Sequence, residues 1–235
     1  MGSEEYEQFL LSMVENIPVL IPMSLDLGVS KETFVSSSSD LLDVEVPVDV
    51  PRQDGSVVRK SMLYSDFLHQ VLVEKKEGLY VKDWHINNSG VDLIVPFLFE
   101  DDWLNWYFLN IRNKRKLDAK KDESDDDYSF AYVGSRNTFT PVHHDVCYSY
   151  SWSFNITGYK RWTMWPPNNN SALFGHSNNS NNSTQDQNGD VVKDARKGNF
   201  DKAVYPSLGE GDGRVTFLQQ PGEAIFVPSG WYVFK

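Results

Sequence analysis

An alternating stretch in the middle of the chain constrains its fold more than any other feature. Between residues 149 and 156, serine or asparagine alternates with an aromatic or aliphatic residue. Successive side chains of a β-strand point to opposite faces, so the pattern predicts a strand with a packed aromatic face and a polar face. Just before it, His143 and Asp145 share a strand face, while His144 points the other way. An imidazole beside a carboxylate predicts a metal site at the mouth of a small β-barrel.

Short strands separated by turn signals fill the second half of the chain, whereas helices dominate the first. This order favours a mainly β fold, an antiparallel barrel or double-sheet jelly roll wrapped by an N-terminal helical arm. The Asp54-Gly55 pair predicts a turn. Pro47 cannot donate to a ladder, so its strand is expected at a sheet edge. The expected helices cover residues 4–17, 61–75 and 101–107, and the expected strands cover 44–48, 79–85, 128–133, 149–156, 215–218 and 224–227.

Charge and cysteine content restrict the partners and the compartment. The formal net charge is −11 and the pI is about 4.8, which disfavours nucleic acid and favours a basic protein or peptide partner. The single cysteine, Cys147, excludes an internal disulfide and fits a reducing compartment. The first thirty residues contain no long apolar run, so no signal peptide or membrane contact is expected. We therefore expect a cytoplasmic location, with the nucleus as an alternative.

Composition also suggests a domain organisation. Residues 1–60 are expected to form a helical and irregular arm, and residues 61–235 the barrel domain. A basic run that turns acidic, residues 112–127, predicts a solvated loop. Residues 168–190 are rich in Asn and Ser and predict a disordered insertion, in which His176 faces solvent.

An ordered series of motifs resembles the JmjC-domain Fe(II)- and 2-oxoglutarate-dependent oxygenases of the small hydroxylase type. The likeness covers about residues 60–232 and is greatest to the lysyl hydroxylases that act on the translation termination factor. A lone His-x-Asp motif is weak, but the full series is specific. The series consists of Thr140-Pro141, His143-x-Asp145, Gly158-Tyr159-Lys160-Arg161-Trp162, Pro166-Pro167, Pro221-Gly222-Glu223-Ala224 and Val227-Pro228-Ser229-Gly230-Trp231.

The resemblance implies a double-stranded β-helix and a specific set of site residues. Iron in this family is held by two histidines and one carboxylate, and His143 and Asp145 match two of these ligands. Further residues match positions that bind the co-substrate 2-oxoglutarate: Thr140, Lys160, Tyr80 and Ser153. The implied reaction is hydroxylation of a protein side chain, with lysine in the translation termination factor as the implied substrate.

Several of these residues also have a purely structural interpretation. Thr140 precedes a proline, which by itself favours extended backbone. Tyr80 fits a core position as well as a co-substrate contact. Trp152 and Trp162 are interpreted as core residues, and His69 and His85 as structural. His144 is interpreted as the variable residue between the two ligands.

One position departs from the family pattern. The second iron-binding histidine is expected two residues after Trp231, and that position holds Val233, which cannot coordinate iron. The sequence stops at Lys235, so the expected barrel lacks its last strand. One explanation is a truncated isoform or gene model. The other is a catalytically inactive JmjC interaction module. Histone lysine demethylation ranks lower because no cysteine cluster is present, and a sugar-binding jelly roll is disfavoured by Lys160 with Thr140.

Overall fold

The computed structural model describes residues 3–22, 28–36, 40–91, 93–108, 110, 128–169 and 213–235. These residues fall into two compact units. The barrel unit comprises Met1–Ser24 with Phe139–Lys235, and the sheet unit comprises Leu25–Thr138. The expected loop at 112–127, His176 and nearly all of the expected 168–190 insertion lie outside the described residues.

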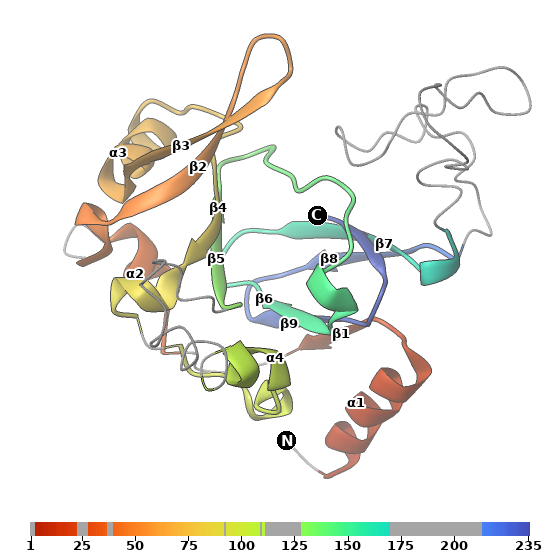
Figure 1. The fold of residues 1–235 in the computed structure, drawn as a ribbon. Coiled ribbons are helices and arrows are strands. Elements are labelled where there is room, and N and C mark those ends of the chain that lie inside the picture. The colour runs from red at the N-terminus through yellow and green to blue at the C-terminus, as the bar shows by residue number, and fades with distance from the viewer. Residues whose placement is uncertain are drawn as a thin grey trace, which may run out of the picture. The chain divides into compact units, whose positions relative to one another are not determined.

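The barrel unit contains two three-stranded antiparallel sheets (Figure 1). The first has the order β1-β9-β6 and the second the order β10-β7-β8. Their strands are β1 (Val19–Pro22), β6 (Ser151–Phe154), β7 (Lys160–Trp165), β8 (Val215–Gln219), β9 (Glu223–Val227) and β10 (Tyr232–Phe234). Apart from the pair β7 and β8, neighbours in these sheets are not sequential along the chain, as is typical of a jelly roll.

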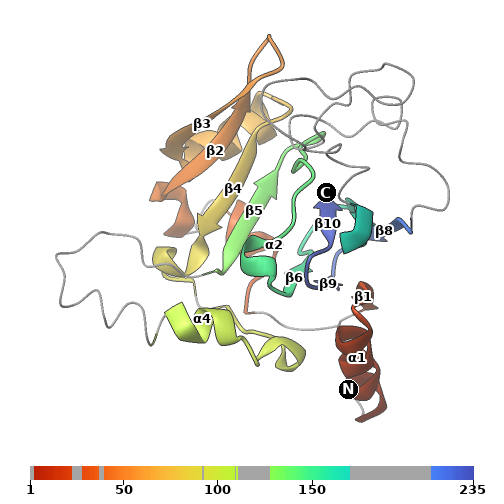
Figure 2. The ribbon, with the colours of Figure 1, turned by 45° about the vertical axis from the view of Figure 1, so that its right-hand side comes forward.

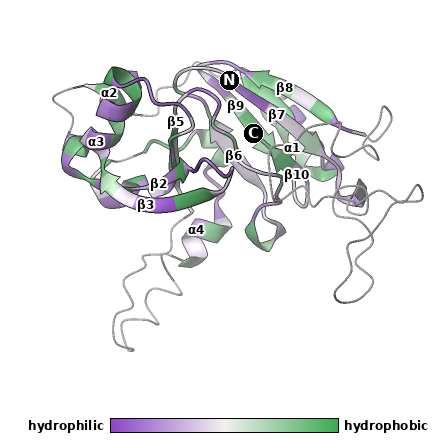
Figure 3. Ribbon diagram, turned by 90° about the horizontal axis from the view of Figure 1, so that it is seen from above, coloured by the Kyte–Doolittle hydropathy of each residue, from purple (hydrophilic) through white to green (hydrophobic). Residues whose placement is uncertain are grey.

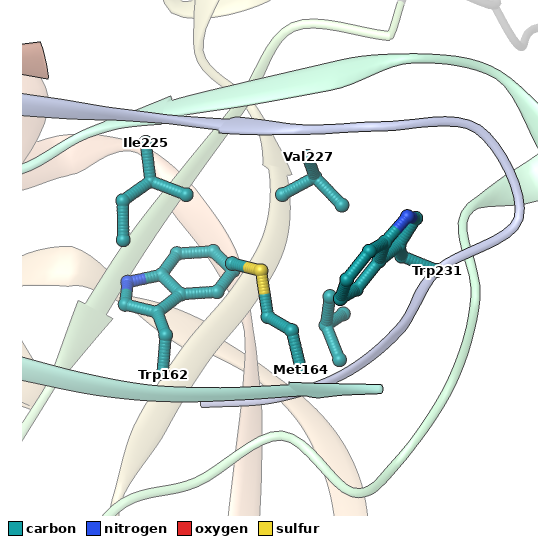
Figure 4. Packing of buried hydrophobic residues seen from close by; sticks show 6 residues of the cluster. Trp162, Met164, Ile225, Val227 and Trp231 are labelled. Carbon is teal, nitrogen blue, oxygen red and sulfur yellow. The ribbon is translucent and has the colours of Figure 1, made fainter. Parts of the chain in front are cut away.

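Side chains from both sheets pack into one apolar cluster. Trp162 and Met164 extend from one face of β7, and Ile225 and Val227 extend toward them from β9 (Figure 4). Spacings of two residues on each strand explain why these side chains share a face. The cluster is completed by Trp231 and Val233. Together with the antiparallel pairing, this two-sheet core confirms the predicted mainly β, jelly-roll fold.

The two faces of β6 are the reverse of what the alternation alone predicts, although the resemblance had already placed Ser153 at an inward position. Ser151 and Ser153 pair with Val227 and Ile225 of the apolar cluster, and directly paired residues share a sheet face. The serines therefore line the inside. Trp152 pairs with Phe226 on the opposite face and is only half-buried, so its assignment to the core was wrong. Alternation predicted two faces but not which face the second sheet covers.

Helix α1 (Ser3–Glu15) ends before Pro18, as predicted. Phe9 is its buried apolar residue and packs edge-on against Phe226, with ring centroids 5.1 Å apart. The end of the helix is fastened to the loop before β10. Asn16 Nδ2 donates to the Ser229 carbonyl at 3.2 Å, and the Trp231 indole donates to the Asn16 carbonyl at 2.9 Å.

The sheet unit is built on four antiparallel strands in the order β3-β2-β4-β5 (Figure 2). They are β2 (Glu45–Pro51), β3 (Val57–Leu63), β4 (Tyr80–His85) and β5 (Phe130–Gly134). The Asp54-Gly55 turn joins β2 to β3 as predicted, and the middle of β3 is hydrophilic (Figure 3). The edge position expected for β2 was wrong. It lies between β3 and β4, but β4 pairs only with Val48 and Asp49, which leaves Pro47 beyond that ladder.

Short helices complete the sheet unit. The helix expected to begin at Ser61 begins instead at Tyr64, because residues 61–63 belong to β3. Asp102 caps α4 by accepting from the Asn105 amide at 2.9 Å, as the acidic start predicted. None of the described helices is long and apolar enough to cross a membrane. The helical segments are α2 (Lys31–Val35), η1 (Asp40–Asp43), α3 (Tyr64–Leu68), the π-helical η2 (His69–Val73), η3 (Ile86–Ser89), η4 (Phe97–Phe99), α4 (Trp103–Tyr107), η6 (Val146–Tyr148) and η7 (Pro167–Asn169), the last two in the barrel unit.

Candidate functional site

His143 is held in the barrel unit by an isolated β-bridge to Val233. The two residues exchange both backbone hydrogen bonds, at 3.1 and 2.7 Å. The imidazole Nδ1 lies 2.8 Å from the Pro141 carbonyl. A carbonyl can only accept, so Nδ1 carries the proton and Nε2 keeps its lone pair. The ring is thus oriented as metal-binding histidines are, with Nδ1 held by a backbone carbonyl.

Asp145 supplies a carboxylate next to that imidazole. Its Oδ2 accepts a short hydrogen bond from the Ser151 hydroxyl on β6, and its Oδ1 lies 3.9 Å from His143 Nε2. Both side chains are accessible, with 34% and 28% of their surface exposed. Ligand bonds of about 2.1 Å place adjacent ligands about 3 Å apart, so a small side-chain rotation would let both bind one ion. His143 and Asp145 therefore fit two neighbouring ligand positions.

The third ligand position is apolar. Val233 is the bridge partner of His143, so its side chain lies on the same face, and it is 2% exposed within the apolar cluster. His144 offers no substitute. Its ring stacks on Tyr148 at 4.5 Å and meets the edge of Tyr232. No group of three His, Cys, Asp or Glu side chains suited to a metal exists in the described part of the chain. Two of the three ligands of an iron centre are present among the described residues, and the position expected for the third holds Val233.

Lys160 begins β7 on the inward face, because it precedes the buried Trp162 and Met164 by two and four residues. Burial lowers the pKa of Lys160 to about 7, and the positive charge of Lys235 acts in the same direction. No salt bridge within the described residues involves Lys160. A desolvated ammonium without a carboxylate partner is suited to bind an anionic ligand.

Two other predicted contact residues also lie in the barrel unit. Thr140 is 3% exposed, and its backbone pairs with Lys235 in both directions. Ser153 lies on the inner face of β6 opposite Ile225. Tyr80 belongs to the sheet unit, where it is buried with its ring centroid 6.1 Å from that of Tyr132. The ligand roles of these residues stay predictions.

Sequence reasoning missed Gln219, a fully buried amide. Its Oε1 accepts from the Trp162 indole at 2.8 Å, and its Nε2 donates to the Ser153 and Glu223 carbonyls, each at 2.8 Å. The alternation of Val215, Phe217 and Gln219 along β8 was the signal that could have placed it inside. It also missed Lys235, whose ammonium lies 4.8 Å from the centroid of the Trp162 ring.

Comparison with known proteins agrees with this geometry. The family described as "JmjC domain, hydroxylase" matches residues 130–235, which include both candidate metal ligands and every strand of the barrel unit except β1. Residues 130–235 of this chain belong to the JmjC family. The predicted dioxygenase family is thereby confirmed.

Curated relatives support the same assignment for the JmjC domain. The mouse protein named 2-oxoglutarate and iron-dependent oxygenase JMJD4 is 32% identical over 72% of this chain and 36% of its own length. Its zebrafish namesake is 35% identical over 67% of this chain and 33% of its own. The Arabidopsis arginine-specific demethylase JMJ20 is 37% identical over 66% of this chain and 32% of its own. The chain thus spans about a third of the length of these relatives.

Proposed function

We propose that this chain acts as a 2-oxoglutarate- and Fe(II)-dependent protein hydroxylase of the JmjC family. The observation that carries the proposal is the pairing of His143 with Asp145 in the same barrel unit as the inward Lys160. Relatives named for 2-oxoglutarate and iron support the same two cofactors. In location we propose the cytoplasm, with the nucleus as the alternative.

Each residue would have a defined part in binding. His143 and Asp145 would hold the iron, which when bound supplies oxygen activation. Ser151 fixes Asp145 by its hydrogen bond, so the carboxylate keeps Oδ1 toward His143. The protonated ammonium of Lys160 would bind the distal carboxylate of 2-oxoglutarate, and the Thr140 hydroxyl would donate beside it. Trp162 and Met164 exclude water from that end of the site.

We propose a lysine side chain of the translation termination factor as the substrate. The net charge of −11 suits a basic protein segment, and disfavours nucleic acid as a partner. One relative is named an arginine-specific demethylase, so methylated arginine is the competing substrate to test.

The proposal predicts a measurable product. Purified chain with Fe(II), 2-oxoglutarate and a termination-factor fragment is expected to give succinate and a fragment that has gained one oxygen atom, by mass spectrometry. His143→Ala and Asp145→Ala are the matched controls and should abolish both signals, because each removes a ligand from a centre that has two. Product that still forms after both substitutions would contradict the assignment of His143 and Asp145 as iron ligands. If the chain turns over a methylarginine peptide and not the termination-factor fragment, methylated arginine would be its substrate instead of lysine.

A second candidate function is a JmjC interaction module that binds its partner without turnover. Val233 favours it, because two protein ligands hold iron more weakly than three. If the termination-factor fragment binds the chain but no succinate forms even at saturating iron, the chain is an interaction module and not a hydroxylase.

The proposed 2-oxoglutarate site predicts a specific pH dependence. Lys160 must be protonated to bind a carboxylate, and its pKa in the ligand-free protein is lowered to about 7. Affinity for 2-oxoglutarate should be greatest below about pH 7 and fall by up to about tenfold per pH unit above it. Calorimetric titrations from about pH 6 to about pH 9 would measure this. Lys160→Arg is the matched control, since arginine stays charged throughout and should give a flat profile.

A further inference from the structure

A second lysine lies near Lys160. Lys235 directly follows β10, and its backbone exchanges hydrogen bonds with Thr140 in both directions. It is two residues beyond Val233, whose side chain lies in the apolar cluster, and so it extends from the same face of the chain. Its ammonium lies 4.8 Å from the centroid of the Trp162 ring, a side chain of that cluster.

The two ammonium groups interact with each other. The charge of Lys235 is close enough to lower the pKa of Lys160, in addition to the larger effect of burial. Like charges near one another in a poorly solvated interior repel, and an anion between them reverses the sign of that interaction. The Trp162 ring stabilises the Lys235 ammonium by a cation–π contact. The arrangement is therefore suited to a ligand with two negative charges.

We propose that Lys235 is a second cation of the 2-oxoglutarate site, and that Lys160 and Lys235 together bind a small dicarboxylate without a metal ion. This inference rests on the proposed function and deepens it. In a site with one cation, the second carboxylate of the ligand depends on the metal. Here the second ammonium can compensate that carboxylate, which matters because the part of the chain that the structure describes supplies two ligands to the metal centre, not three.

Binding to metal-free protein tests the inference. The protein is treated with a chelator and titrated with 2-oxoglutarate, with succinate, a dicarboxylate that is one carbon shorter and has no keto group, and with butyrate, in which a methyl group replaces one carboxylate of succinate. Tryptophan fluorescence is a suitable readout because Lys235 lies over Trp162. Succinate is expected to bind, and butyrate at least about tenfold more weakly, because one charge-assisted contact is lost.

Substitutions at position 235 isolate the second cation. Lys235→Met should reduce dicarboxylate affinity by about 10- to 100-fold, the size of one lost charge-assisted contact, while leaving butyrate affinity nearly unchanged. Lys235→Arg keeps the charge and should retain binding within about threefold. Lys235→Met should also move the pH at which affinity falls upward, because Lys160 loses a repelling neighbour. A merely structural role of Lys235 would change thermal stability without moving that pH.

Two results would overturn the inference: dicarboxylate binding that requires a divalent metal, or Lys235→Met binding as tightly as the unmodified chain. These failures are distinguishable from failure of the proposed function. Metal-free binding that depends on both lysines supports the inference even if no hydroxylated product forms. Product that forms while Lys235→Met has no effect would overturn the inference and leave the hydroxylase proposal in place.

Discussion

Val233→His is expected to raise the affinity for Fe(II) by at least about 100-fold, since loss of even an outer-shell partner of a metal ligand costs 10–100-fold. The residue is the direct bridge partner of His143 and shares its face, so an imidazole there would extend toward the His143 and Asp145 pair. The yield of hydroxylated product should also increase by at least about 100-fold in Val233→His, because a third ligand completes the facial arrangement of this class of iron site.

Val233→His should also lower the stability of the metal-free protein, and this loss provides a second measurement. Val233 is 2% exposed in an apolar cluster, and an imidazole without a partner there should destabilise the metal-free protein by about 1–3 kcal/mol. Added metal should reverse the loss. Val233→Leu is the control: it adds comparable bulk without a donor atom, and should leave metal affinity unchanged. Equal Fe(II) affinity in Val233→His and Val233→Leu would show that position 233 does not face the ion.

Trp162→Ala should lower the free energy of unfolding of the barrel unit by about 3–5 kcal/mol. Trp162 is 1% exposed and contributes the largest side chain of the cluster between the two sheets, together with Trp231. Its removal leaves a cavity between β7 and β9 and also leaves the Gln219 Oε1 without its indole donor. Urea unfolding followed by circular dichroism measures the loss.

Two comparison variants separate packing from hydrogen bonding. Trp162→Phe keeps most of the ring but removes the N–H, and should cost about 1–3 kcal/mol from the unsatisfied Gln219 oxygen. Trp103→Ala removes a tryptophan that is 70% exposed, and should change stability by less than about 0.5 kcal/mol. A loss below about 1 kcal/mol for Trp162→Ala would contradict the packing described for the two sheets.

Local patterns predicted most strands because alternation, glycine and proline signals act over a few residues. The turn at Asp54-Gly55 and the strands β4, β8 and β9 were found this way. The inner face of β6 was predicted wrongly, since bulky residues at 150, 152 and 154 mark a packed face only when another sheet covers it. Which face is covered depends on packing against β9, which is far away in sequence, and on how β7 turns back over it. The start of α3 was missed because β3 continues through residues that also fit a helical pattern.

At the candidate site, too, local spacing was predictable from the sequence and contacts between distant segments were not. His143 and Asp145 were predicted from a two-residue spacing, and the structure brings Nε2 and Oδ1 within 3.9 Å. Lys235 could not be predicted as a site residue, because its nearness to Lys160 arises from β10 pairing with β7. The order of the motifs predicted that position 233 corresponds to a ligand position of the family. The β-bridge between Val233 and His143 is a tertiary contact, which the spacing of residues in the sequence cannot show.

The buried amide of Gln219 has a consequence for how sheet alignment is chosen during folding. One side chain bonds to β7, β6 and the start of β9, and its bond to the Trp162 indole requires one particular alignment of β7. A shift of β7 by a single residue would turn Lys160 outward, bring Arg161 inward and take the Trp162 indole away from the Gln219 oxygen, which would then be buried without its donor. The indole bond of Gln219 therefore favours the alignment of β7 in which Lys160, and not Arg161, lies on the inner surface.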